Sequence, residues 1–362
     1  MKIMYLLYSF TIGGTEKLVS DICNEISKEN EVHLFIVNDH YDEAMVSKIS
    51  SNVKINLYGR KVGSKKKIRT MVDIYTYCKK NKIEVVHCNA FNTPELLILT
   101  KILMKNVKIV YTIHGVNQYA TLGKIRILYR NWLSDSIIAI SQSVYDDIVS
   151  CGADSKKTHI VYNAINMEQF QPAEHKIKHN PFTIGNVARI DVSKKGQDIL
   201  LDAMLLIKDK CSFRCMFAGA PAKGNQEEFL NLEDRARNDF QNDECEVKFI
   251  GSITDVAGFL GKIDLFVLPS RFEGFGISLV EAMSMGVPCI SSDINGPREI
   301  IGNNERGYLF ESGSSEKLAD RILYVMNNYE EALMVADKAR MYVSENFDIR
   351  NMCEKLLNIY RG

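Results

Sequence analysis

The sequence has no long apolar run, no excess of either charge and no paired cysteine spacing. A membrane-spanning helix needs about 20 consecutive apolar residues, and no stretch of the chain approaches that length. The apolar start, MKIMYLLYSF, is short and runs into a Gly-Gly loop without a signal cleavage pattern. These absences argue against a membrane-spanning or exported protein and predict a cytoplasmic one.

Charge and cysteine usage exclude two further classes. Lys+Arg and Asp+Glu number 45 each, so the composition lacks the basic surplus that favours nucleic acid, and we expect no nucleic-acid partner. Cys211 and Cys215 have no second pair that would complete a zinc site. We interpret the nine cysteines as core thiols of a reducing compartment.

Repeats and several motifs are also missing. There is no short tandem repeat and no low-complexity segment. The classical dinucleotide fingerprint, G-x-G-x-x-G, does not occur, so dinucleotide binding is poorly supported. No Asp-x-Asp motif stands at the end of an expected strand, so nothing requires a metal, and no cofactor is indicated.

The sequence does contain a regular alternation of short apolar runs with amphipathic stretches, which is typical of βαβ units and parallel sheets. Its length is too great for one ordinary α/β domain and sufficient for two. Strands are expected at 2–8, 32–38, 53–57, 84–87, 108–112, 136–140, 158–162, 183–188, 214–218, 246–250, 265–268 and 288–291. Helices are expected at 16–28, 68–80, 94–104, 143–151, 196–207, 227–239 and 276–285, with further helices dominating the end.

The two series of strands are separated by a polar segment without a periodic apolar face. We therefore predict an α/β protein with a Rossmann-like N-terminal domain over 1–170, a linker over 171–181 and a second Rossmann-like domain over 182–345. A C-terminal helix over 346–362 is expected to pack back on the first domain. Two doubly wound domains facing each other across a cleft would bind ligands at the carboxyl ends of their strands.

The balanced total hides an asymmetry between the two halves. Residues 1–170 hold 22 Lys+Arg against 16 Asp+Glu, whereas the remainder holds 23 against 29. Much of the surplus lies in residues 60–69, RKVGSKKKIR. This segment is either an ordinary solvated surface or a peripheral anchor on anionic lipid, which would give access to a lipid-linked acceptor.

The strongest local feature is residues 270–290, SRFEGFGISLVEAMSMGVPCI, at the end of an apolar strand. Gly274 and Gly276 precede a helix, whose N-terminal amides and dipole suit a phosphate or a sugar hydroxyl. Glu273 and Glu281 are candidate acceptors for diols at two parts of one extended ligand. As an alternative, Glu273 is a solvated loop residue and Glu281 a charge on the helix surface.

Three weaker features follow other expected strands. Arg189 and Lys195 lie in the first turn of the second domain, beside a helix start, which is a suitable pyrophosphate site. Gly13 and Gly14, in TIGGTEK, allow a tight turn with close approach of the backbone. His114, in YTIHG, stands at the carboxyl end of a strand, although a lone histidine is more often structural.

In these motifs the chain resembles glycosyltransferase family 4, the retaining enzymes of the GT-B fold. Further segments resemble the same family and follow in its order along the chain: AISQSVYDDI, HIVYNAINMEQF, ARIDVSKKG, FIGSITD and GPREIIGNNERGYLF. The resemblance covers nearly the whole chain, and EGFGISLVE is its most specific part. Two positions depart from the family pattern: Gly115 follows His114 where Asp is frequent, and Ala164 follows Asn163 where Gly is frequent. The first departure affects the geometry around His114.

The resemblance implies a role for each candidate residue. Glu273 would contact donor-sugar hydroxyls and Glu281 the nucleotide ribose, while Arg189 and Lys195 would bind the diphosphate. His114 would approach the reacting sugar from the acceptor-side N-terminal domain. The remaining implied donor contacts come from Gly13, Gly14, Gly274, Phe275 and Gly276.

The expected function is therefore metal-independent transfer of a hexose or N-acetylhexosamine from a nucleotide-diphosphate sugar, UDP in preference to GDP. The acceptor would be a glycan or lipid-linked molecule of bacterial surface-polysaccharide biosynthesis, at the inner face of the plasma membrane. A sugar-nucleotide epimerase, a glycan phosphorylase and a non-catalytic sugar-nucleotide-binding protein are the alternatives. A phosphorylase would need a cofactor lysine that the sequence does not identify.

Overall fold

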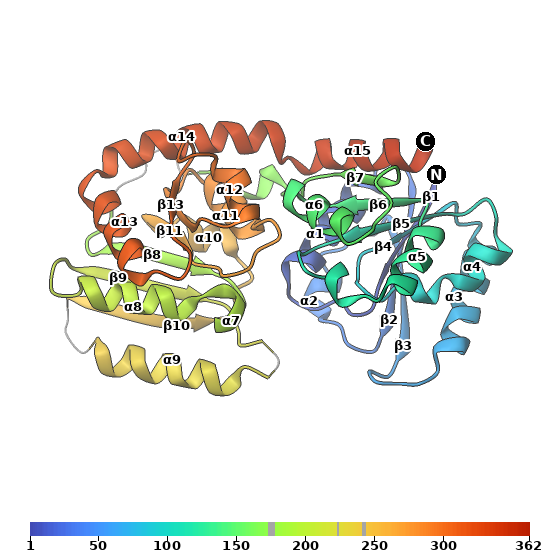
Figure 1. Ribbon diagram of the computed structural model, residues 1–362, viewed down its shortest axis with the longest axis horizontal. Coiled ribbons are helices and arrows are strands. Elements are labelled where there is room, and N and C mark those ends of the chain that lie inside the picture. The colour runs from blue at the N-terminus through green and yellow to red at the C-terminus, as the bar shows by residue number, and fades with distance from the viewer. Residues whose placement is uncertain (173–177, 223, 241–243) are drawn as a thin grey trace. The chain divides into compact units, whose positions relative to one another are not determined.

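The computed structural model describes residues 1–172, 178–222, 224–240 and 244–362. The chain folds into two compact units: unit 1 comprises residues 1–165 and 349–362, and unit 2 comprises residues 166–348. Of the expected linker over 171–181, residues 173–177 lie outside the described part. Both units are α/β sandwiches in which helices cover a parallel sheet (Figure 1).

Unit 1 contains a seven-stranded sheet in the order β3-β2-β1-β4-β5-β6-β7, and every described strand pair is parallel. Its strands are β1 (Lys2–Leu7), β2 (Glu31–Asn38), β3 (Val53–Arg60), β4 (Val85–Cys88), β5 (Lys108–Ile113), β6 (Ser136–Ala139) and β7 (Thr158–Ile160). Its helices are α1 (Gly14–Ile26), α2 (Glu43–Val46), α3 (Lys67–Asn81), α4 (Ile98–Leu103), α5 (Lys124–Leu133), α6 (Gln142–Ser150) and α15 (Ile349–Arg361).

The strand order of unit 1 reverses direction between β1 and β4. The central strands are buried on both faces, as the apolar runs of the sequence require for a parallel sheet. Helix α15, drawn in red, returns to this unit and packs against α1 (Figure 1). Because β1, β4 and β5 are neighbouring parallel strands, their carboxyl ends lie together at one edge of the sheet.

Unit 2 contains a six-stranded parallel sheet in the order β10-β9-β8-β11-β12-β13. Its strands are β8 (Phe182–Val187), β9 (Phe213–Ala218), β10 (Cys245–Gly251), β11 (Leu265–Leu268), β12 (Cys289–Ser292) and β13 (Tyr308–Phe310). Its helices are α7 (Val192–Lys195), α8 (Gln197–Ile207), α9 (Gln226–Asp239), α10 (Val256–Leu260), α11 (Ile277–Ser284), α12 (Asn295–Ile301), α13 (Ser315–Asn327) and α14 (Tyr329–Asn346).

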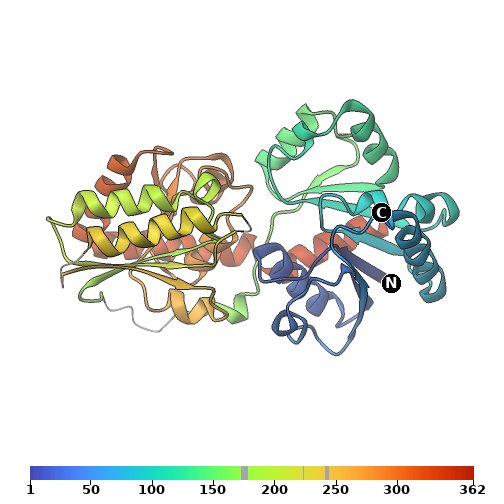
Figure 2. The same ribbon diagram turned by 90° about the horizontal axis from the view of Figure 1, so that it is seen from below.

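The core of unit 2 is built between its sheet and the helices on either face. Helices α8 and α9 lie side by side (Figure 2), and α13 packs beside α8. Leu200, Met204 and Ile207 of α8 are fully buried and join Phe213 and Phe217 of β9 in one apolar cluster. Helix α11 packs against α14, so the loop that leads into α11 is supported by a rigid helix pair.

The structure differs from the sequence predictions at several elements. The single helix expected over 94–104 is wrong, because a 3₁₀ turn at Pro94–Leu96 precedes α4. The 3₁₀ turn ends at Leu96, and Leu97 is the N-cap residue of α4, with φ −101° and ψ 5° outside the helical range. The short strand β13 was not expected because three residues show no periodicity. Helix α5 was also missed, since its apolar residues lie on both of its faces.

None of the helices in the described ranges is long and apolar enough to cross a bilayer.

Candidate active site

The two candidate motifs of unit 2 follow neighbouring strands of its sheet. Strands β8 and β11 are paired, with Ile184 opposite Leu265, and the chain continues from them in opposite directions along the sheet. Ligands of doubly wound sheets bind at the carboxyl ends of strands at such a reversal. Arg189 and Lys195 follow β8, and Glu273 follows β11, so the fold brings both motifs to this position.

Lys195 and Glu273 form an ion pair. The distance from Lys195 Nζ to Glu273 Oε2 is 2.5 Å, and the two side chains are 26% and 17% exposed. Such a partly buried, charge-assisted hydrogen bond orients both groups. Arg189 is exposed, and its guanidinium makes no hydrogen bond or ion pair with the described residues. The structure therefore joins Lys195 to Glu273 and leaves the Arg189 guanidinium open to an anion.

A second arginine, not singled out from the sequence, fixes this arrangement. The Arg271 guanidinium donates to both carboxylate oxygens of Asp198, at 2.7 and 2.8 Å, and to the carbonyl oxygen of Val192 at 2.7 Å. The backbone N–H of Arg271 also donates to the carbonyl of Lys194 at 2.8 Å. These bonds hold the loop after β11 against the turn that carries Lys195. The sequence signal was an arginine in the loop that follows a strand, three residues after Leu268.

The loop between β11 and α11 is shaped by close backbone approaches. Gly276 precedes α11 with φ 109°, a conformation that side chains rarely adopt. A Cβ on Gly296, in α12, would lie 2.8 Å from the carbonyl carbon and oxygen of Gly274. The N-terminus of α12 therefore supports the loop at Gly274, and the amides before α11 are held in place.

The other candidates in this segment differ in exposure. Glu281 is only 4% exposed, so it is not the surface charge of the alternative interpretation. Phe275 is also buried and meets the Phe347 ring edge-on, with ring centroids 5.2 Å apart. Its side chain therefore belongs to the core.

Two buried polar groups were missed by the sequence analysis. Asn186 Oδ1, on β8, and Ser270 Oγ, just after β11, are buried and have no hydrogen-bond partner among the described residues. Unpaired buried acceptors and donors are costly. Asn186 lies on β8 and Ser270 just after β11, the two strands that flank the reversal of strand order. Periodicity could not have distinguished these two residues from ordinary core positions.

In unit 1, His114 stands at the end of β5 and faces Asn89, which follows β4. The distance from His114 Nε2 to Asn89 Oδ1 is 3.3 Å, and Asn89 Nδ2 is buried without a partner among the described residues. Burial lowers the pKa of His114 to about 4, so the imidazole is neutral at pH 7. A neutral imidazole offers one donor and one acceptor to a ligand.

Gly13 and Gly14 form the start of α1, directly after β1. Gly13 is the N-cap residue and has extended backbone, and no side chain caps this end. Because β1 neighbours β4 and β4 neighbours β5, the two glycines lie at the same sheet edge as His114. No interaction among the described residues joins either glycine to His114.

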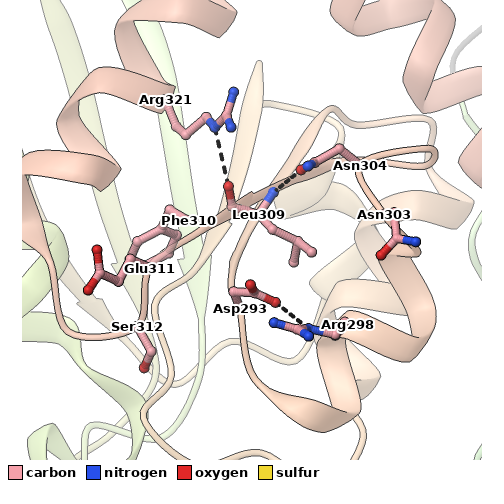
Figure 3. A pocket seen from close by; sticks show the side chains of 9 residues that line it. All are labelled: Asp293, Arg298, Asn303, Asn304, Leu309, Phe310, Glu311, Ser312 and Arg321. Carbon is pink, nitrogen blue, oxygen red and sulfur yellow. Dashed lines mark hydrogen bonds and ion pairs between the residues drawn. The ribbon is translucent and has the colours of Figure 1, made fainter.

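A pocket of about 440 Å³ lies elsewhere in unit 2, at the ends of β12 and β13 (Figure 3). Arg298 donates to Asp293 at 2.5 Å, and Arg321 donates to the carbonyl of Leu309 at 3.2 Å. Its lining consists of Asp293, Arg298, Asn303, Asn304, Leu309, Phe310, Glu311, Ser312 and Arg321. Two arginines face two carboxylates, so the lining is electrically balanced, and none of the candidate residues contributes to it.

The chain matches two family models in succession. Residues 12–169 match Glycosyltransferase Family 4, and residues 167–342 match Glycosyl transferases group 1. The UDP-Gal:α-D-GlcNAc-diphosphoundecaprenol α-1,3-galactosyltransferase of Escherichia coli is 24% identical over 320 residues, 83% of this chain and 81% of that protein. The O-antigen biosynthesis glycosyltransferase WclY, also of Escherichia coli, is 24% identical over 100% of this chain and 98% of its own length.

The fold has solved counterparts. The crystal structure of Anabaena HepE in complex with UDP and glucose superimposes with a TM-score of 0.84 at 20% identity, covering 99% of this chain and 98% of that one. This likeness confirms the prediction of two Rossmann-like domains. With the two family models spanning residues 12–342 between them, the chain belongs to glycosyltransferase family 4 and is a glycosyltransferase with the GT-B fold.

Proposed function

We propose that the chain is a retaining enzyme that transfers a hexose or N-acetylhexosamine from a UDP-sugar to a lipid-linked glycan in surface-polysaccharide biosynthesis. The observation that carries the proposal is the 2.5 Å contact between Lys195 Nζ and Glu273 Oε2. It sets a cation for a diphosphate beside a carboxylate for sugar hydroxyls, next to the start of α11. The UDP in the Anabaena structure and the diphosphoundecaprenol acceptor in the relative's name support the choice of ligands.

The reaction breaks the bond between the anomeric carbon and a phosphate oxygen, and negative charge develops on the departing UDP. Lys195, Arg189 and the N-terminal amides of α11 stabilise this charge. Retention means that the bond between the anomeric carbon and the acceptor oxygen forms on the face from which UDP leaves, and the acceptor hydroxyl gives its proton to the departing diphosphate. Glu273 accepts hydrogen bonds from donor-sugar hydroxyls, and Glu281 from the ribose. The neutral imidazole of His114 and the amides at Gly13 and Gly14 complete the substrate contacts.

The proposed acceptor places the enzyme at the inner face of the plasma membrane. Helix α5 supports this, because Ile125, Leu128 and Trp132 are 84%, 68% and 49% exposed and recur at the i, i+3, i+7 spacing of one helical face. Lys124 and Arg126 stand exposed on the same helix. An apolar stripe with adjacent cations suits an anionic bilayer surface, as does the basic segment 60–69.

The decisive assay incubates the purified chain with UDP- and GDP-sugars and a GlcNAc-diphospholipid acceptor, and measures nucleoside diphosphate release and the glycolipid product. We expect acceptor-dependent UDP release, a product with retained anomeric configuration, and loss of at least 100-fold in kcat/KM for Glu273→Gln. Epimerisation of the sugar nucleotide without acceptor would identify an epimerase instead. Binding of UDP-sugar without turnover of any acceptor would leave only a sugar-nucleotide-binding protein.

A further inference from the structure

Strand β3 leads into α3 through a loop at one corner of unit 1 (Figure 1). A second cavity, of about 640 Å³, is lined by residues of this corner. Its polar lining includes Tyr58, Arg60, Lys61, Lys66, Arg69 and Asp73. Arg60 ends β3, and its carbonyl accepts the backbone N–H of Asp39, which follows β2, at 2.9 Å. The cavity, which we call the corner pocket, therefore opens at the carboxyl end of β3, the outermost strand of the unit 1 sheet.

The guanidinium of Arg60 is incompletely paired in this pocket. Its Nη2 donates to the carbonyl of Ser64 at 2.6 Å, but Nε and Nη1 are buried and have no hydrogen-bond partner among the described residues. The centre of the guanidinium lies 5.9 Å from the Tyr8 ring centroid. Arg60 as a whole is half-buried, and buried donors without acceptors are unfavourable. An anion entering the pocket would satisfy those donors.

The start of α3 carries charges of the wrong sign for its dipole. Helix N-termini favour acidic residues and capping side chains, yet α3 has no acidic residue in its first turn and Lys66 provides no side-chain cap. The N–H groups of Ile68 and Arg69 donate to no backbone carbonyl among the described residues. Lys65 adds further positive charge there, whereas Lys67 Nζ lies 3.9 Å from a carboxylate oxygen of Glu95. A bound anion would stabilise this end of the helix.

The negative charge of the lining does not balance these cations. Asp73 is the one carboxylate among the lining residues, and it accepts from Tyr58 Oη at 2.6 Å and lies 3.7 Å from Arg69 Nε. Four cationic side chains therefore face one carboxylate that is already engaged. The pocket of Figure 3, with two arginines and two carboxylates, has no such surplus.

We infer that the corner pocket binds a phosphoryl group, with Arg60 as its principal ligand and Lys66, Arg69 and the first amides of α3 as its other contacts. The cavity is larger than one phosphate needs, so the phosphoryl group belongs to a larger ester or diphosphate. Resting on the proposed function, we assign that ester to the acceptor side of the reaction. Its source is either a lipid headgroup or carrier, or a soluble phosphate ester, and Val62 and Ile68, which are 60% and 76% exposed beside the pocket, favour the lipid.

The test uses the full chain and a pair of variants with opposite predictions. Inorganic diphosphate is titrated calorimetrically and in thermal unfolding against wild type, Arg60→Met and Arg189→Met, the last removing a cation from the proposed donor site. Because two of the three Arg60 guanidinium nitrogens have no hydrogen-bond partner among the described residues, Arg60→Met should melt at or above the temperature of the wild type without ligand. In calorimetry, Arg60→Met should bind diphosphate at least tenfold more weakly in one binding event, and Arg189→Met should retain the wild-type affinity of that event. Addition of diphosphate should raise the melting temperature of the wild type more than that of Arg60→Met.

A second arm separates the two sources. Wild type and Arg60→Met are co-sedimented with phosphatidylcholine vesicles that contain or lack phosphatidic acid. Arg60-dependent binding to phosphatidic acid vesicles supports the lipid source, and Arg60-dependent binding of diphosphate without such vesicle binding supports the soluble one. The inference is overturned when Arg60→Met binds both ligands like the wild type. UDP release measured in parallel with a preformed donor and acceptor tests the proposed function separately, since a phosphoryl site in unit 1 can exist whether or not that assay succeeds.

Discussion

The phenol oxygen of Tyr360, on α15, lies 2.5 Å from Nδ1 of His87, on β4, although 273 residues separate them in the chain. Tyr360 Oη is also 2.9 Å from Tyr5 Oη, and His87 Nε2 is 2.6 Å from Thr112 Oγ1. The four side chains form a buried hydrogen-bonded row across β1, β4 and β5. This row fixes α15 to unit 1 and lies just below the sheet edge that carries His114.

The row makes unit 1 sensitive to acid. Burial lowers the pKa of His87 to about 3, so the unfolded chain binds the proton more readily than the folded one. Stability is therefore present above the ordinary histidine pKa of about 6.5 and is lost as the pH falls from there toward 3. Between pH 7 and pH 5 the loss from this residue should be about 2 kcal/mol.

Trp132 is the single tryptophan and lies in unit 1, so its fluorescence in urea reports the unfolding of that unit. The pH dependence of the wild type should exceed that of His87→Gln by about 2 kcal/mol over this range. The remaining slope in the variant belongs in part to His114, whose pKa is lowered by burial as well. Equal slopes in the two proteins would show that His87 does not carry the effect.

The ion pair between Lys195 and Glu273 predicts that substitution of each partner has a different effect on UDP binding and turnover. Lys195→Ala removes a cation from the proposed diphosphate site, so UDP should bind about 10- to 100-fold more weakly, as expected for a charged hydrogen bond. Glu273→Gln keeps an amide oxygen that can accept from Lys195 but removes the carboxylate proposed for the sugar hydroxyls, so UDP affinity should change less than threefold while turnover falls. Lys194→Ala is the matched control, because Lys194 is 66% exposed and 3.9 Å from Asp191. Calorimetry with UDP that ranks Lys194→Ala with Lys195→Ala would contradict the assignment.

The close packing around Gly296 predicts that one added methyl group, without any change of charge, disturbs the site. Its Cβ would lie 2.8 Å from the carbonyl of Gly274 and 2.9 Å from that of Glu273, so Gly296→Ala must displace the loop before α11. We expect a cost of about 1–3 kcal/mol in unfolding free energy and weaker UDP binding. Gly261→Ala, with nothing nearer than 3.5 Å and helical backbone, should change neither. A Gly296→Ala protein with wild-type melting and affinity would show that the loop relaxes freely.

The sequence predicted the sheet of unit 1 and most of unit 2 because buried parallel strands are continuous apolar runs. The strand expected at 265–268 coincides with β11, and those around it differ by one to three residues. It did not predict β13, whose three residues are positioned by pairing with β12. Local pattern cannot reveal such pairing between segments.

Of the candidate site, the sequence could predict only the residues that follow the ends of strands. Arg189, Lys195 and Glu273 could be named because the carboxyl ends of neighbouring strands meet. The bidentate contact between Arg271 and Asp198 depends on how two loops cross, and the unpaired nitrogens of Arg60 depend on burial. Both are properties of tertiary packing, so neither leaves a mark in composition or spacing.

The exposed stripe of α5 yields the last prediction. Trp132 is 49% exposed, and a tryptophan that enters the headgroup region of a bilayer leaves water, so its emission should shift to shorter wavelength. Vesicles with phosphatidylglycerol should cause the shift, and vesicles of phosphatidylcholine alone should cause less, because Lys124 and Arg126 flank the stripe. Adding salt should weaken the binding by screening these charges.

Ile125→Asp combined with Leu128→Asp should abolish both the shift and co-sedimentation, since the two side chains are 84% and 68% exposed and their removal costs the folded protein little. Met334→Asp is the matched control on an equally helical, 60% exposed position in unit 2, and it should bind vesicles like the wild type. If the double variant still binds while Lys65→Ala with Lys67→Ala does not, the basic segment 60–69 alone holds the membrane. If all variants bind equally, α5 is an ordinary solvent-exposed helix.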